Sequence, residues 1–89
     1  MEFKSGFALR EIAGEKVVTA EGLENINFNK LIALNETAAD IWKNFYGKTF
    51  EVADVASFLV DEYGIDMELA MNDSAKICNS WIDAGVLDK

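Results

Sequence analysis

The spacing of hydrophobic and polar residues changes near residue 35 of this chain. Before that point, short runs of apolar and β-branched residues are separated by turn-forming residues, a pattern that predicts β-strands. After it, apolar residues recur every three or four positions, which predicts amphipathic helices. The sequence therefore predicts an α+β protein in which a β half precedes an α half.

Three strands are expected in the first half. Residues 7–13 and 16–20 form the first two, and Gly14-Glu15 suits a two-residue hairpin turn with glycine at the first central position. Residues 21–29 are rich in asparagine and predict a loop. Residues 30–34 then form the third strand.

Three helices are expected in the second half, each with a start signal and a glycine that ends it. Together with the strands they are typical of a winged-helix-like domain, and we expect one domain over residues 1–89. The first helix is expected to start at Asn35 and end at Gly47, and the second to start at Thr49 or Phe50 and end at Gly64. The third is expected to start at Asp66 and end at Gly85, after which Val86 and Leu87 fold back.

Many winged-helix domains bind DNA through their last helix, so a DNA-binding regulator is one alternative. The charge argues against it. The chain has eight basic and sixteen acidic residues, a net charge of −8, and its basic residues are scattered. Binding to nucleic acid or to an anionic membrane needs clustered Lys and Arg. No signal-peptide core or membrane-spanning run is present in the sequence, which predicts a cytoplasmic protein.

The side chains that catalysis or metal binding needs are scarce. There is no histidine, and Cys78 is the single cysteine. Cys78 falls on the apolar face of the last helix, as do Trp42 and Trp81 on theirs, so all three are expected in the core. We therefore expect no enzymatic activity, no metal site and no cofactor.

The third strand is the strongest candidate for function. Leu31, Ile32, Ala33 and Leu34 are apolar on both faces, and such a strand at a sheet edge promotes unwanted pairing. In one explanation the strand lies in mid-sheet and is covered on both faces, which the pattern alone slightly favours. In the other it is an open edge to which another strand adds through main-chain hydrogen bonds. A homodimer that pairs through this strand is a further alternative.

Four short motifs are spread over most of the chain. They are Leu34-Asn35-Glu36-Thr37-Ala38-Ala39 with Ile41-Trp42, Gly47-Lys48-Thr49, Tyr63-Gly64-Ile65-Asp66, and Trp81-Ile82 with Gly85-Val86-Leu87. Together they resemble the PqqD family, the small accessory proteins of pyrroloquinoline quinone biosynthesis and their relatives. The resemblance covers about residues 7–87 and implies a three-stranded sheet packed on three helices.

The resemblance also implies a function. Family members recognise the leader of a ribosomally made precursor peptide, which adds as a strand to the third strand and lies against the third helix. A modifying enzyme, such as a radical S-adenosylmethionine enzyme, then acts on the delivered peptide. The peptide-binding residues implied here are Lys30, Leu31, Ile32, Ala33 and Leu34 in the strand, and Ala70, Asp73, Lys76, Ile77 and Ser80 in the helix.

Overall fold

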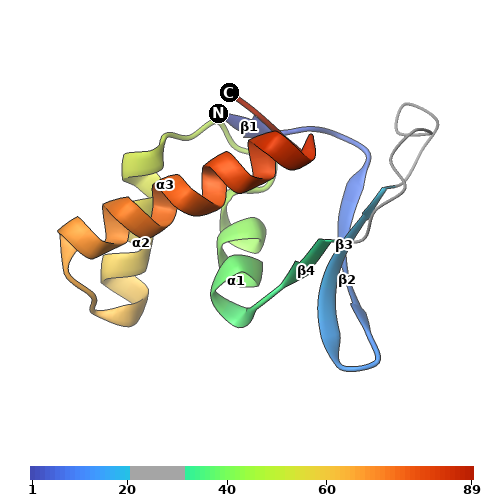
Figure 1. Cartoon of the computed structure of the whole chain (residues 1–89), viewed down its shortest axis with the longest axis horizontal. Coiled ribbons are helices and arrows are strands. Elements are labelled where there is room, and N and C mark those ends of the chain that lie inside the picture. The colour runs from blue at the N-terminus through green and yellow to red at the C-terminus, as the bar shows by residue number, and fades with distance from the viewer. Residues whose placement is uncertain (21–31) are drawn as a thin grey trace. The chain divides into compact units, whose positions relative to one another are not determined.

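The computed structural model describes residues 1–20 and 32–89 and shows an α+β fold (Figure 1). A three-stranded antiparallel sheet is followed by three helices, which confirms the predicted fold class. The predicted loop at residues 21–29, together with Lys30 and Leu31, lies outside the described residues. The elements are β1 (Glu2–Phe3), β2 (Phe7–Ile12), β3 (Glu15–Ala20), β4 (Ile32–Leu34), α1 (Glu36–Phe45), α2 (Val52–Tyr63), α3 (Met67–Ala84) and β5 (Leu87–Asp88).

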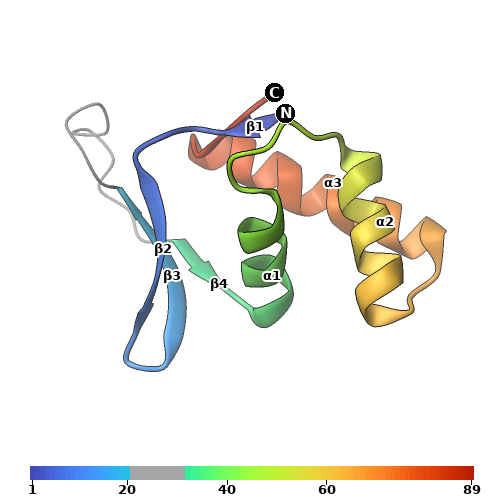
Figure 2. The ribbon, with the colours of Figure 1, turned by 180° about the vertical axis from the view of Figure 1, so that it is seen from behind.

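The chain forms two compact units. Residues 4–44, called the sheet unit, contain β2, β3, β4 and nearly all of α1. Residues 1–3 and 45–89, called the helical unit, contain α2, α3 and a two-stranded sheet of β1 and β5. Figure 2 shows the same elements from behind.

The hairpin between β2 and β3 turns one residue earlier than predicted. Ile12 pairs with Glu15, so the two central residues are Ala13 and Gly14 rather than Gly14 and Glu15. Both have positive φ, at 53° and 82°, as the type I′ turn requires. Glycine therefore occupies the second central position, and Ala13 adopts a left-handed conformation that is uncommon for a residue with a side chain.

The α1 helix begins as the sequence predicts. The Asn35 side-chain oxygen accepts a hydrogen bond of 2.8 Å from the Ala38 backbone N–H, the contact of an N-cap residue. The predicted apolar face is confirmed, because all four of its residues are buried. They are Ala38, Ile41, Trp42 and Phe45.

The α2 helix begins later than the predicted Thr49 or Phe50. The Phe50 backbone N–H donates to the Met1 carbonyl at 2.8 Å, and the Met1 nitrogen donates to the Phe50 carbonyl at 2.7 Å. These bonds hold Phe50 in extended pairing. Glu51 becomes the N-cap, and its backbone N–H donates to the Asp54 carboxylate at 2.8 Å.

The α3 helix packs against α2 and carries a stripe of small buried residues. Ala70, Ser74 and Cys78 recur every four positions, so they lie on one side of the helix. Asp66 is the N-cap of α3, as predicted, although its side chain makes no capping hydrogen bond.

Replacing Ser74 with alanine is expected to raise the free energy of unfolding by about 1 kcal/mol. The Ser74 hydroxyl oxygen is fully buried and has no hydrogen-bond partner among the residues that the structure describes, which is unfavourable, and alanine also favours helix. Urea unfolding followed by circular dichroism measures the change. Ser80→Ala, at an exposed position of the same helix, reports the helix propensity alone. If both variants raise the free energy of unfolding by the same amount, the buried hydroxyl of Ser74 does not destabilise the protein.

Candidate functional site

The β4 strand lies at an edge of the sheet. The strand order is β2-β3-β4, and in the part of the chain that the structure describes β4 pairs only with β3. Among residues 1–20 and 32–89, the strand therefore lies at the edge and not in the middle of the sheet. The cause is topological, since β3 is the central strand and uses both of its hydrogen-bonding edges.

The register shows which backbone groups of β4 face outward. Because Ile12 and Glu15 flank a two-residue turn, they form a hydrogen-bonded pair, and alternation directs the backbone of Val17 toward β2. The neighbouring residues of β3 therefore direct their backbone groups toward β4, where Val18 pairs with Ile32 and Lys16 pairs with Leu34. The N–H and C=O of Ala33, between those two partners, point away from β3 to the open edge.

The side chains of β4 alternate in burial. Ile32 and Leu34 are half-buried and share a face of the sheet with Val18, which is fully buried. Ala33 is exposed and shares the opposite face with Val17. Because side chains project from the faces of a strand, the side chain of Ala33 does not block the hydrogen-bonding edge.

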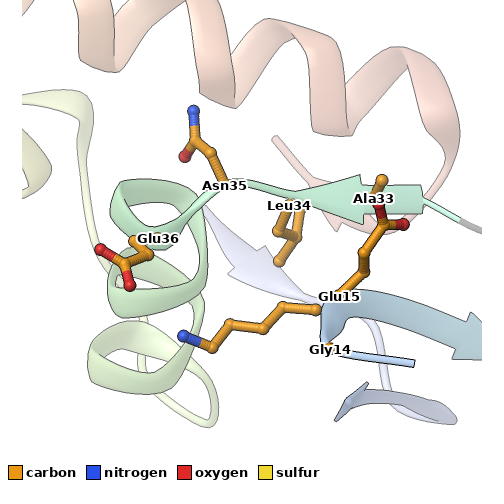
Figure 3. A pocket seen from close by; sticks show the side chains of 7 residues that line it. Gly14, Glu15, Ala33, Leu34, Asn35 and Glu36 are labelled. Atoms are coloured by element: carbon orange, nitrogen blue, oxygen red, sulfur yellow. The ribbon is translucent and has the colours of Figure 1, made fainter. Parts of the chain in front are cut away.

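A shallow hollow of about 360 Å³ adjoins the end of β4 (Figure 3). Residues of the hairpin turn line one side, and residues from the end of β4 to the start of α1 line the other. The lining therefore combines an apolar part with two carboxylates and one ammonium group. The residues are Gly14, Glu15, Lys16, Ala33, Leu34, Asn35 and Glu36.

Sequence reasoning missed the hairpin side of this hollow. Lys16 and Leu34 are far apart in the sequence and become neighbours only through the β3–β4 register. The available signal was Lys16, the positively charged residue at the start of the second predicted strand. Its position beside the end of β4 can be recognised only when the β3–β4 register is known.

The helix residues implied by the resemblance lie on α3, in the helical unit. Asp73, Lys76 and Ser80 are exposed, and Ile77 is half-buried. Asp73, Ile77 and Ser80 follow one another at spacings of four and three and so share a flank of the helix. Ala70 is fully buried in the small-residue stripe, so its side chain is not part of the exposed surface.

Cys78 lies in the core, as predicted. Its side chain is buried, and burial raises the pKa of the thiol despite the opposing positive charge of the N-terminus. The thiol therefore stays neutral near pH 7, and the neutral form is a poor nucleophile. Within residues 1–20 and 32–89, no three His, Cys, Asp or Glu side chains gather as metal ligands do, and no helix could span a membrane.

Comparison with known proteins identifies one family. The profile described as Coenzyme PQQ synthesis protein D (PqqD) matches residues 8–87. Searches of curated proteins and of solved structures found no match. The matched region contains β4, the hollow beside it and the whole of α3. Because the match covers nearly the whole chain, the protein belongs to the PqqD family of coenzyme PQQ synthesis proteins.

Proposed function

We propose that this protein is a non-catalytic adaptor that binds the leader of a ribosomally made precursor peptide as an added strand on β4. In this proposal, residues 1–89 act as one peptide-recognition domain that delivers the peptide to a modifying enzyme, such as a radical S-adenosylmethionine enzyme. The observation that carries the proposal is the outward-facing backbone of Ala33 at an open sheet edge. Membership of a family of biosynthetic accessory proteins supports it.

Strand addition supplies affinity and selectivity by different means. The backbone of an added strand bonds to the N–H and C=O of Ala33, a contact that any extended peptide can make. Selectivity must come from side chains of the leader. The hollow beside Leu34 offers apolar surface with Lys16 and Glu36 at its border, which suits a side chain with an apolar stem and a polar end.

Further leader contacts are proposed on both elements that the resemblance implies. Lys30 and Leu31 would extend the pairing strand, and α3 would contribute the exposed flank described above. On α3, Asp73 and Lys76 carry opposite charges, and Ile77 provides apolar surface. These side chains would read the sequence of the leader, whereas β4 fixes its direction and register.

The same edge supports a second candidate, a homodimer in which two copies of β4 pair. Two antiparallel β4 strands could exchange hydrogen bonds around Ala33 without any peptide. The two candidates can be distinguished by hydrogen exchange of the Ala33 amide. In a homodimer, protection of this amide needs no peptide and increases with protein concentration. The DNA-binding alternative gains no support, since the net charge of −8 opposes contact with phosphates.

The test is an amide NMR titration with the leader of a short peptide encoded beside the gene. We expect shifts concentrated in residues 32–34 and in α3, together with slower solvent exchange of the Ala33 N–H. A leader of scrambled sequence is the control. Saturable binding whose shifts avoid β4 would contradict strand addition, and protection of Ala33 without peptide would favour the homodimer.

A further inference from the structure

The two faces of β4 offer different surroundings to an added strand. On one face Ile32 and Leu34 are apolar and half-buried, and on the other Ala33 is exposed. Because side chains alternate along a strand, a leader paired with β4 places successive side chains on opposite faces. Apolar leader residues are therefore expected beside Ile32 and Leu34, and polar leader residues beside Ala33.

Glu15 is an acidic residue of β3 on the same face of the sheet as Ala33. Ala33 pairs with Val17, and Glu15 lies two positions before Val17 on β3, so the three side chains share this face. Glu15 is exposed, and it lines the hollow beside β4 together with Ala33. Figure 3 shows the Glu15 side chain extending toward Ala33, whereas the Leu34 side chain lies on the other side of β4. A carboxylate thus lies on the face where polar leader side chains are expected.

The other charged residues near this face are placed differently. Lys16 pairs with Leu34, so its half-buried side chain lies on the opposite face of the sheet. Arg10 shares the face of Glu15 but belongs to β2, the strand farthest from β4. Glu36 adds a second exposed carboxylate at the first turn of α1. Within β2, β3 and β4, the charge nearest to an added strand on this face is therefore negative.

The distance across β4 restricts which leader side chains can reach Glu15. Neighbouring strands lie about 4.8 Å apart, so a strand added to β4 runs roughly 10 Å from β3. The side chains of serine, threonine and asparagine are too short to cross this gap, whereas lysine and arginine carry a cation on a long flexible stem. Ala33 lies between the two strands and has only a methyl side chain, so a long stem can cross above it.

We propose that Glu15 determines specificity by selecting a leader with lysine or arginine on the Ala33 face of the added strand. This inference rests on the proposed function, because it requires the leader to pair with β4. The cation forms an ion pair with Glu15, and its stem covers Ala33. Backbone pairing fixes where the leader lies, and this contact helps to decide which leader is accepted. The net charge of −8 attracts the same class of peptide at longer range.

The probe is a short synthetic peptide of alternating valine and threonine with one lysine among the threonines, titrated into the protein and followed by amide NMR. A second peptide carries diaminobutyrate in place of lysine, which has the same charge on a shorter stem. General attraction to a negative protein is therefore equal for the two peptides. We expect both to shift the Ala33 amide signal, and the lysine peptide to bind about threefold more tightly.

Matched variants identify the carboxylate that is responsible. Glu15→Gln should abolish the preference for lysine and keep the Ala33 shift. Glu11→Gln removes the same charge from the opposite face of the sheet and should keep the preference. Equal affinity of the two peptides, or a preference that persists in Glu15→Gln, would overturn this inference and leave strand addition standing. If neither peptide shifts the Ala33 amide signal, strand addition itself is wrong and the inference fails with it.

Discussion

Replacing Trp81 with alanine is expected to lower the free energy of unfolding by about 3–5 kcal/mol, the usual loss for a buried aromatic side chain. Trp81 is 2% exposed and lies on the buried stripe of α3. Its ring meets the Phe3 ring edge-on, with the centroids 5.3 Å apart. Alanine would remove this contact and leave a cavity in the helical unit.

The loss is large because the contact joins segments far apart in the sequence. Phe3 belongs to β1, which pairs with β5, and its ring also lies 5.5 Å from that of Phe50. Weakening the Phe3–Trp81 contact therefore affects the anchoring of β1 and the segment before α2. A protein of this size has a total stability of roughly 4–13 kcal/mol, so Trp81→Ala would remove a large share of it.

Urea unfolding followed by far-ultraviolet circular dichroism measures this change. The matched control is Tyr46→Ala, since Tyr46 also lies beside Phe3, at 6.0 Å between centroids, but is 41% exposed. We expect it to cost about 1 kcal/mol, because a large part of the Tyr46 side chain already faces water in the folded protein. A similar loss in both variants would contradict the central role of Trp81.

Much of the fold was predictable because its signals are local. Asn35 precedes an apolar run of helical period, and it caps α1 as expected. Gly64 and Gly85 adopt left-handed conformations at the ends of α2 and α3, which few other residues tolerate. These features depend on residues within one or two turns of each other, so the sequence alone reveals them.

The predictions that were wrong depend on contacts between residues far apart in the sequence. The pairing of Phe3 with Leu87 joins two strands of two residues each, too short for a recognisable pattern. The same end of the chain holds Phe50 in extended pairing and so delays the start of α2. The hairpin turn was predicted one residue too late because Ala13, rather than a glycine or asparagine, occupies the first left-handed position.

The candidate site was only partly predictable, because some of its features are local in the sequence and others depend on strand pairing. An apolar strand before Asn35 could be recognised from the sequence, but its place at the edge depends on strand order. The direction of each N–H group depends in turn on the hairpin register, which fixes Ala33 as the outward-facing residue. This direction yields the sharpest test of strand addition.

Ala33→Pro is expected to weaken leader binding at least about tenfold and to leave the sheet intact. Proline lacks the N–H that an added strand would use, and the partner carbonyl would lose its hydrogen bond on burial. The Ala33 N–H does not bond to β3, and the side chain is exposed, so the ring has space in the free protein. Calorimetric titration with the leader measures the affinity, and circular dichroism checks the fold.

Two further variants make the result specific to the open edge. Ala33→Val keeps the N–H while enlarging the side chain, so a strand should still add to β4. Ile32→Pro removes an N–H that faces Val18 and should destabilise the sheet, because that donor belongs to the β3–β4 ladder. If Ala33→Pro folds normally and binds the leader as tightly as the unmodified protein, strand addition at β4 is wrong, since no strand can hydrogen-bond to a donor that is absent.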